Sequence, residues 1–454
     1  MIEEAFKGKG ELEHYLPHHP VFKGEKIREV YNASARTRGR KSLNDHMFRG
    51  PLKLPDLAGM IMRFRLSKFP LLADIEKAFL QIELEESERE VTKFLWLKDI
   101  SKPLNNDNLI IYRFTRVVFG IICSPSLLAM TIEHRLSKYP SKENLFKNIY
   151  VDNVFVDCNT EEEVYEQYIE LKKIFTEGKM NLREFVTNAR NALKNISEND
   201  RLMDTNQKIL GIKWDLKEDN LEIKFPIAKP EIKITRRKVL EVMASLFDPL
   251  GLVSSCLVNP KLLFQKLWDI PKHWDEELEI DHLNEWKYIL KSWKDQEIII
   301  PRIVTHKEKT IKYQLHVFVD ANKNTYAAAV YLRSDEKENL KVSLIYARNR
   351  IKSKKQNLTI PRMELLALLI GTRALKFVEN ELKMEIEKKF VWSDAKVVLL
   401  WINCKEKQPR FIENRLLEIR KNTDCIFKYV STTENPADVC TRGCTPDELR
   451  INDL

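Results

Sequence analysis

The sequence predicts an α+β multidomain protein, and three observations lead to that prediction. The 454 residues are enough for two or three domains, each with its own hydrophobic core. Residues 149–156 are typical of a β-hairpin, because apolar strands flank the polar turn Asp152-Asn153. From residue 312 the predicted elements follow the order βββαβα and then βα, which indicates a mixed sheet with helices packed over it. Both regions therefore combine strands with helices.

Composition restricts the class of protein further. Hydrophobic residues make up 43% and charged residues 31%, which is the ordinary balance of a globular chain. The sequence has no run of about 18 apolar residues and no signal-peptide layout at its amino terminus, so we expect a cytoplasmic protein that does not span a membrane. Its seven cysteines form no C-x-x-C pair and are expected to be reduced thiols. A net charge of +9 is compatible with a polyanionic partner but does not establish one.

The first 60 residues are irregular and basic. A hairpin is expected over residues 21–31, which carry Lys23, Lys26 and Arg28. A cationic patch follows, and its members are Arg36, Arg38, Arg40 and Lys41. This patch is interpreted either as a contact to nucleic acid or as a solvated loop.

The next elements alternate between strands and helices. Pro125 is expected to open a helix, since proline is favoured at the first helical position. The acids at 161–163 suit the amino-terminal dipole of another helix. The expected strands are 71–75, 92–97, 109–114 and the 149–156 hairpin; the expected helices are 126–138 and 160–176, and turns and strands follow at 178–183 and 209–215.

The rest of the chain divides into a helical segment and a mixed segment. Residues 226–300 carry helical signals at 239–247 and 262–268, interrupted by Asp248-Pro-Leu-Gly251, with no evident chemistry. The mixed segment then follows. It has expected strands at 313–321, 326–334, 340–348, 389–393 and 426–431, and helices at 362–380, 396–403 and 411–421 before a last short helix.

Acidic residues lie where these predicted elements begin or end. In the mixed segment they are Asp320, Glu364, Asp394 and Asp438. Clustered carboxylates repel one another unless a cation neutralises them, and hard oxygen ligands select Mg²⁺ or Mn²⁺. Two such ions roughly 3.5–4 Å apart can activate a water and stabilise the leaving oxygen of a phosphodiester. Each acid alone is more often a cap or a surface residue, but four at element boundaries favour a metal site. Asp74 and Asp152, brought together from distant strands, would form a second one.

Several motifs together resemble those of known families. Those that resemble reverse transcriptase are Ala73–Phe79, Phe119-Gly120 through Ser124-Pro125, Tyr150-Val-Asp152 and Leu210-Gly211. Those that resemble ribonuclease H are Asp320, Glu364, Asp394 and Asn435-Pro-Ala-Asp438. The order of these motifs, with Leu16–Pro20, Ser42–Asp45 and Leu246–Leu252, is similar to that of BEL/Pao-type retrotransposon polyproteins.

The resemblance implies a fold and a division of the chain. It implies a palm-and-fingers polymerase over residues 1–225, a helical thumb or connector over 226–311, and a ribonuclease H-like domain over 312–454. The implied activities are RNA-directed DNA synthesis and cleavage of the RNA in RNA–DNA hybrids. The implied partners are RNA or DNA primer-templates, hybrids and deoxynucleoside triphosphates, with other element-encoded proteins as further candidates. Virus-like particles become an alternative setting within the cell.

The resemblance also implies roles for single residues. Asp74 and Asp152 would bind the polymerase metals, and Phe79 would block the ribose 2′-hydroxyl while also belonging to the core. Arg28, with Lys23 or Lys26, would hold the triphosphate. The residues implied to shape the floor under template and nucleotide are Gly120, Ser124 and Pro125. The four acids Asp320, Glu364, Asp394 and Asp438 would be the metal ligands of the nuclease.

One position departs from the family pattern. The hairpin normally carries two adjacent aspartates, whereas here the second position is Asn153. An amide keeps the shape and one oxygen ligand but loses a charge, which weakens a site for two cations. The alternatives are therefore a decayed copy with nuclease activity only, or a non-catalytic nucleic-acid-binding protein.

Overall fold

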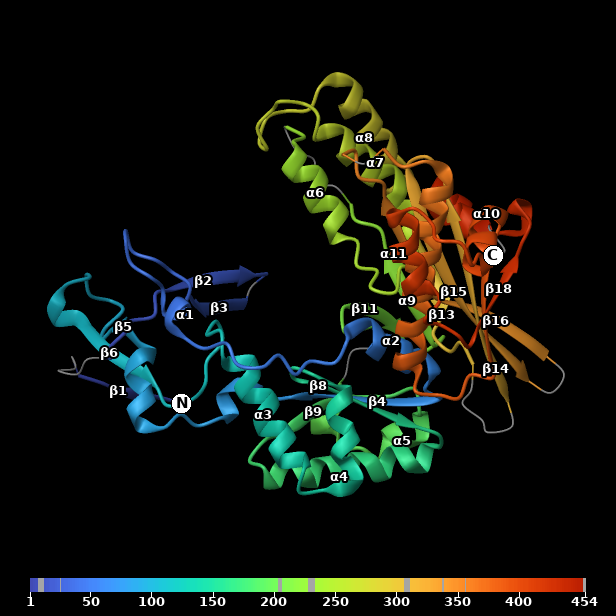
Figure 1. The fold of residues 1–454 in the computed structure, drawn as a ribbon. Coiled ribbons are helices and arrows are strands. Elements are labelled where there is room, and N and C mark those ends of the chain that lie inside the picture. Colours follow the sequence, from blue (N-terminus) through green and yellow to red (C-terminus); the bar gives the residue numbers. More distant parts are fainter. Residues whose placement is uncertain are drawn as a thin grey trace. The chain divides into compact units, whose positions relative to one another are not determined.

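The computed structural model contains two compact units, which Figure 1 shows along the chain. The first unit consists of residues 1–55 and 69–203, and the second of residues 56–68 and 204–454. The structure describes residues 1–6, 12–24, 26–202, 206–227, 233–305, 311–336, 339–355 and 357–451.

The first unit is built on three sheets. Their strand orders are β1-β6-β5, β2-β3 and β7-β8-β4-β9. The strands are β1 Ile2–Glu4, β2 His18–Lys23, β3 Lys26–Tyr31, β4 Phe69–Ile75, β5 Lys93–Leu97, β6 Leu109–Phe114, β7 Ile149–Tyr150, β8 Asn153–Cys158 and β9 Leu182–Val186. The α-helices are α1 Leu43–His46, α3 Ser124–Leu136, α4 Glu161–Glu177 and α5 Arg190–Asn195.

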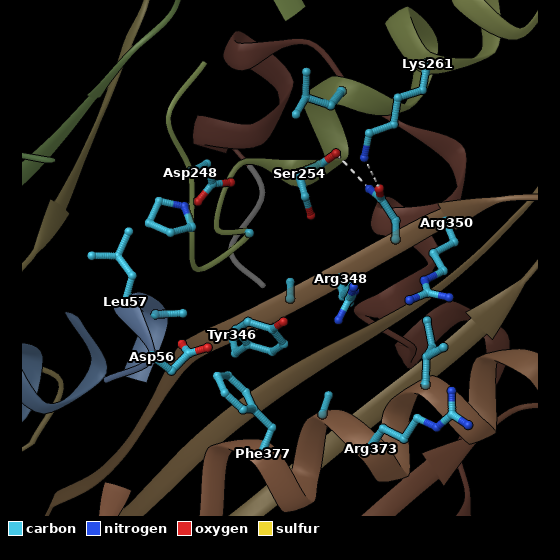
Figure 2. Close-up of a pocket in the computed structure, with 18 residues that line it drawn as sticks. Asp56, Leu57, Asp248, Ser254, Lys261, Tyr346, Arg348, Arg350, Arg373 and Phe377 are labelled. Atoms are coloured by element: carbon cyan, nitrogen blue, oxygen red, sulfur yellow. Dashed lines mark hydrogen bonds between the residues drawn. The ribbon is translucent and has the colours of Figure 1, made fainter. Parts of the chain in front are cut away.

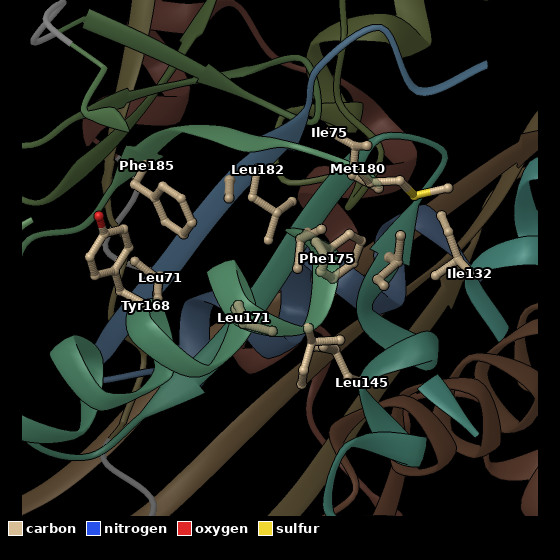
Figure 3. Packing of buried hydrophobic residues seen from close by; sticks show 14 of the residues in the cluster. Leu71, Ile75, Ile132, Leu145, Tyr168, Leu171, Phe175, Met180, Leu182 and Phe185 are labelled. Atoms are coloured by element: carbon tan, nitrogen blue, oxygen red, sulfur yellow. The ribbon is translucent and has the colours of Figure 1, made fainter. Parts of the chain in front are cut away.

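Helices α3, α4 and α5 lie on one side of the β7-β8-β4-β9 sheet (Figure 1). Figure 3 shows the core between them, where Leu171 and Phe175 of α4 point toward Leu182 and Met180. The helix begins at Thr160, whose side chain accepts the backbone N–H of Glu163, and three glutamates follow in its first turn. This core gives the sheet a rigid base for the strand ends that carry Asp74 and the β7–β8 turn.

The expected elements of the first unit are confirmed. The hairpin at 149–156 forms as β7 and β8, and the strands expected at 92–97 and 109–114 pair as β5 and β6. Pro125 stands in the first turn of α3. The predicted amino-terminal hairpin forms as β2 and β3.

The second unit contains a small sheet, a group of helices and a larger sheet. The small sheet has the order β10-β11-β12-β13 and the larger one the order β16-β15-β14-β17-β18. The strands are β10 Asn206–Ile209, β11 Ile212–Asp215, β12 Asn220–Lys224, β13 Glu297–Pro301, β14 Lys312–Ala321, β15 Thr325–Glu336, β16 Asn339–Ile351, β17 Lys388–Ser393 and β18 Cys425–Tyr429. The α-helices are α2 Leu57–Leu66, α6 Arg236–Ser245, α7 Val258–Leu267, α8 Ile280–Trp293, α9 Ile360–Leu382, α10 Lys396–Asn403, α11 Arg410–Ile419, α12 Ala437–Arg442 and α13 Pro446–Ile451.

The larger sheet has the mixed topology that the sequence predicts. Strands β14, β15 and β16 form an antiparallel meander, and β17 and β18 add to β14 in parallel. Helix α9 packs against this sheet with α11 beside it (Figure 1). Gly371 faces the Val319 side chain of β14, where any Cβ would collide with it. The close approach fixes the position of α9 on the sheet, and therefore the position of Glu364 relative to the end of β14.

Buried Arg302 explains why residues 56–68 belong to the second unit. Its guanidinium donates to the Asp219 carboxylate at 2.6 and 2.7 Å. It also donates to the carbonyl oxygens of Phe64 at 2.8 Å and Ser67 at 2.6 Å. A buried charge needs such partners, and here they come from the carboxyl end of α2 and from the turn between β11 and β12.

Two features of the second unit were not expected from the sequence. Strand β13 lies within the segment interpreted as helical and pairs with β12 from Asn220↔Pro301 to Lys224↔Glu297. Residues 56–68 and 204–225, which we assigned to the first domain, group with residues 226–454. The division at residues 225 and 311 stays a prediction.

No helix in the described part of the chain is both long and apolar enough to cross a bilayer. All seven cysteines are free thiols.

Candidate active sites

The first candidate site lies where β4 meets the β7–β8 hairpin. Asp74 of β4 is paired in register with Asn153, and the Ile75 amide donates to the Asp152 carbonyl at 2.9 Å. Val151, in the tight turn, has φ of 58°, which is unusual for a β-branched residue. Such strain persists where the surroundings impose it, and it occurs often at functional sites. The turn places Asp152 beside Asp74, as the sequence predicts.

Burial and neighbouring acids perturb Asp74. Its pKa is raised to about 6, first by burial and then by the charges of Asp152 and Glu184, while Arg183 lowers it. The Arg183 Nε lies 3.9 Å from Asp74 Oδ1. Arg183 and Glu184 belong to β9, which pairs with β4, and the sequence analysis did not single them out. The site is therefore acidic but partly balanced by one guanidinium.

The amide of Asn153 contacts the acid that it follows. Its Nδ2 donates to Asp152 Oδ1 at 2.8 Å. A second aspartate at this position could not donate in that way and would add a negative charge. Asn153 therefore stabilises the Asp152 carboxylate and occupies one of its lone pairs.

Phe79 and two of the predicted floor residues, Gly120 and Ser124, are each held by a separate contact. The Phe79 ring is buried and meets Phe119 edge-to-face, with centroids 4.6 Å apart. Ser124 is buried and its hydroxyl donates to the Val118 carbonyl at 2.7 Å. Gly120 has φ of 92° and accepts a hydrogen bond at its carbonyl from Asn44 Nδ2 at 2.9 Å. Asn44 belongs to the Ser42–Asp45 motif, which therefore anchors the loop before α3.

The cationic patch Arg36, Arg38, Arg40 and Lys41 is exposed, and Arg36 in it forms an ion pair. Arg36 makes a bidentate pair with Asp45 at 2.8 and 3.0 Å, and the pKa of Asp45 is lowered to about 2, chiefly by the Ser42 backbone and by Arg36. Arg38 and Arg28 are exposed. The side chains of Lys23 and Lys26 lie outside the described residues, so their predicted role stays a prediction.

The second candidate site gathers three of the four predicted nuclease acids. Asp320 is near the end of β14, Glu364 is in the first turns of α9, and Asp394 directly follows β17. One carboxylate oxygen from each lies within 4.8 Å of the others. Adjacent parallel strands bring the carboxyl ends of β14 and β17 to one edge of the sheet, which explains the convergence.

Burial and neighbouring carboxylates raise the pKa of two of these acids, Glu364 and Asp320. The pKa of Glu364 is raised to about 9, mainly by burial and further by the charges of Asp320 and Asp394. Burial also raises the pKa of Asp320 to about 6; a hydrogen bond from Thr441 lowers it, and the charges of Asp394 and Asp438 raise it. Perturbed carboxyls of this kind are typical of functional sites.

Two oxygen atoms of this cluster are buried without a partner. They are Glu364 Oε2 and Asp394 Oδ1, and no described residue donates to either. Buried polar atoms in native proteins are nearly always satisfied, so such orphans need an explanation. A divalent cation would satisfy both and would reduce the mutual repulsion of the carboxylates. The residues present therefore fit a divalent metal.

Asp438 is placed less centrally than predicted. It lies on α12 outside the group of three, and its Oδ1 pairs with Arg442 at 2.8 Å. The preceding Asn435 is buried and donates to the Val319 carbonyl at 3.0 Å, which fixes this segment beside β14. Asp438 faces Asp320 closely enough to raise its pKa.

Two threonines hold the acids and were missed by the sequence analysis. The Thr441 hydroxyl, one helical turn after Asp438, donates to Asp320. The Thr432 hydroxyl donates to Asp394 Oδ2 at 2.8 Å. A threonine three residues after a candidate ligand on a helix is a weak signal, because only the fold shows which strand it faces.

Two family models match segments of the chain that contain the candidate sites. The family described as reverse transcriptase (RNA-dependent DNA polymerase) matches residues 36–187, which include Asp74 and Asp152. The family described as Pao retrotransposon-like RNaseH-like domain matches residues 235–395, which include the acidic triad. The chain joins a reverse transcriptase domain to a Pao retrotransposon RNaseH-like domain. The predicted resemblance to a Pao-type element is confirmed.

Solved structures support the same fold at low sequence identity. Three structures of the foamy viral protease-reverse transcriptase match with 14% identity each. The dRH form with double-stranded DNA has a TM-score of 0.60, covering 95% of this chain and 67% of that one. The complex with RNA/DNA hybrid has a TM-score of 0.57 and covers 93% of this chain and 51% of that one. A further complex with double-stranded DNA has a TM-score of 0.58 and covers 95% of this chain and 79% of that one. No curated sequence matches.

The family matches indicate the class of enzyme. A reverse transcriptase domain together with an RNaseH-like domain indicates an RNA-directed DNA polymerase and ribonuclease H. These families generally use divalent metals, and their solved neighbours bind nucleic acid.

Proposed function

We propose that this chain degrades the RNA strand of RNA–DNA hybrids with Mg²⁺ or Mn²⁺ at Asp320, Glu364 and Asp394. The observation that carries the proposal is the convergence of these three carboxylates within 4.8 Å, with two buried oxygens that no described residue satisfies. When bound, divalent ions would supply the Lewis acid that activates water and stabilises the departing 3′ oxygen.

The chain's own residues hold this site in place. Thr441 orients Asp320 and Thr432 orients Asp394, whose Oδ1 stays unpaired within the cluster. Glu364 is protonated in the absence of a cation, because its pKa is raised to about 9. Asp438 would act at the edge of the site as a further ligand or as a charge beside Asp320. Its ion pair with Arg442 would break or bend if it bound a cation directly.

The first unit would act as the polymerase, with Asp74 and Asp152 as its metal ligands. Phe79, packed on Phe119, would stand against the ribose 2′ position, and Gly120, Ser124 and Pro125 would shape the floor beneath the nucleotide and template. Arg28 would contact the triphosphate. The proposed partners are primer-templates and deoxynucleoside triphosphates, with other element-encoded proteins as candidates.

The hydrogen bond from Asn153 to Asp152 favours a second candidate function, a nuclease with a weakened polymerase. That bond uses one lone pair of the metal-facing carboxylate, and the amide adds no charge of its own. A domain division of 1–225, 226–311 and 312–454 is proposed for the polymerase, the connector and the ribonuclease H-like domain.

One preparation of the full chain tests both functions. Extension of a labelled primer and cleavage of a labelled RNA–DNA hybrid are measured side by side with Mg²⁺. Rapid cleavage with slow extension supports the nuclease with a weakened polymerase. Binding of the hybrid without either reaction would mean that the chain is a non-catalytic nucleic-acid-binding protein.

A further inference from the structure

The turn Asp248-Pro-Leu-Gly251 has no role in either candidate site, yet it is docked tightly on strand β16. The Asp248 carboxylate accepts the backbone N–H groups of Leu252 and Val253 at 2.9 and 2.8 Å. The Leu250 carbonyl then accepts the Ala347 amide at 2.8 Å. Gly251 has φ of +75°, and a Cβ there would collide with the Ala347 carbonyl. Only glycine therefore lets the turn lie against this strand.

This turn closes one side of a pocket of about 730 Å³ in the second unit. Figure 2 shows the other sides: Tyr346, Arg348 and Arg350 come from β16, and Arg373 and Phe377 come from α9. The volume falls within the range of ligand-binding pockets, roughly 300–1,000 Å³. The floor is apolar in part, while cationic groups lie toward the edge strand.

Two of the four cations in the pocket have partners and two do not. Arg373 pairs with Glu418 at 2.6 and 2.7 Å, and Lys261 donates to Asn349 Oδ1 at 2.7 Å. Arg348 and Arg350 are exposed, and no described residue makes a hydrogen bond or ion pair with either guanidinium.

The two acids of the pocket form no ion pair with Arg348 or Arg350, although the charge of Asp248 acts on Lys261. Asp248 is bound by backbone N–H groups, and Asp56 caps helix α2 by accepting the Gly59 amide at 3.0 Å. Neither carboxylate forms an ion pair with a described residue. The pocket therefore presents two free guanidinium groups, with Lys261 behind them.

The register of the sheet places the backbone of these arginines two strands away from Asp320 of the nuclease site. Asp320 is paired with Ala327, and Ala327 is paired with Asn349. Asn349 therefore lies at the level of Asp320 two strands away, which is about 10 Å at about 4.8 Å per strand. Arg348 and Arg350 flank Asn349 and project from the opposite sheet face, toward α9.

We propose that this pocket binds the phosphodiester backbone of the nucleic-acid duplex that the RNaseH-like domain cleaves, with Arg348 and Arg350 as the phosphate ligands. The guanidinium fork matches phosphate oxygens in geometry as well as in charge. The identity of the duplex rests on the proposed nuclease function. Contacts of this kind position the substrate without reading its sequence.

The test compares the parent with Arg348→Ala/Arg350→Ala and with a matched control, Lys388→Ala/Lys421→Ala. The control residues are exposed; Lys388 begins β17 and Lys421 precedes β18, at the end of the parallel strands away from Asp394. Binding of a labelled RNA–DNA hybrid is measured by fluorescence anisotropy across a salt series with a chelator present, so that it does not depend on catalysis. Hybrid cleavage with Mg²⁺ then gives kcat and KM, and melting curves report folding.

The arginine variant should bind with a log–log salt slope smaller by about 2, since each phosphate contact contributes about 0.9. Its KM should rise on the order of tenfold at moderate salt, with kcat close to the parent value and an unchanged Tm, whereas the control should match the parent. An unchanged slope and KM in the arginine variant would overturn the proposal. If the slope falls as expected but the parent cleaves no hybrid, the phosphate site stands and the nuclease function fails.

Discussion

Glu364→Gln should stabilise the metal-free protein at neutral pH, although it changes a buried residue of the proposed nuclease site. Glu364 is only 7% exposed, and its pKa is raised to about 9 from an ordinary 4.5. Below pH 4.5 the carboxyl is protonated whether the chain is folded or unfolded, so its ionisation does not change the free energy of unfolding. As the pH rises from 4.5 to 9, only the unfolded chain releases the proton, and the folded state loses stability progressively.

The magnitude follows from that pH difference. At pH 7 the interval above 4.5 is about 2.5 units, which at 1.36 kcal/mol per unit is about 3 kcal/mol. Glutamine is neutral at every pH and avoids this cost. For a unit of this size, about 3 kcal/mol corresponds to a rise in Tm of roughly 6–12 °C.

The assay is a melting curve in chelator at pH 4.5 and pH 7, with Glu385→Gln as control because Glu385 is exposed. The gain should appear at pH 7, vanish at pH 4.5 and be absent in the control. Added Mg²⁺ should raise the Tm of the parent more than that of the variant, because binding to the folded site stabilises it. A variant that melts below the parent at pH 7, or a gain that persists at pH 4.5, would refute the reasoning.

Three further outcomes are expected. Asn153→Asp should raise the rate of primer extension on the order of 10²-fold, which is the loss typical when a single transition-state stabiliser is removed. An unchanged rate would mean that the polymerase site is built differently. Replacing Arg36, Arg38, Arg40 and Lys41 by alanine should make the log–log dependence of duplex affinity on salt shallower by about 3 rather than about 4, because Arg36 is already paired with Asp45. An unchanged slope would mean that these residues form a solvated loop. Gly251→Ala should lower the Tm clearly more than Gly39→Ala, since both residues have positive φ but only Gly251 faces a backbone carbonyl; equal losses would contradict the docking role of the turn.

Local patterns allowed much of the fold to be predicted. The hairpin at 149–156, the strand ending near Asp74 and the βββαβα order each depend on periodicity and turn residues within short windows. The acids could be found because strand ends and helix starts were already placed. Asp320 and Asp394 converge because the carboxyl ends of parallel strands meet at one edge of the sheet, and the first turns of α9 bring Glu364 to the same edge.

Contacts between distant segments could not be predicted in the same way. Nothing in residues 56–68 indicates that Arg302 will bind their carbonyl groups. The direction of the Asn153 amide depends on its contact with Asp152, and the donation from Thr441 to Asp320 depends on how α12 packs. The pocket beside β16 arises because Gly251 allows a turn nearly 100 residues away to dock there.

The most direct test of the central claim is cleavage of a labelled RNA–DNA hybrid with Mg²⁺ by the parent chain and by Asp394→Asn. Asp394 offers a buried oxygen without a described partner to the cluster, so removing its charge should nearly abolish cleavage. In chelator the same variant should melt no lower than the parent, because one repelling charge is gone. Full cleavage by Asp394→Asn would contradict the metal site, and lost cleavage with a lowered Tm would mean that Asp394 holds the fold instead.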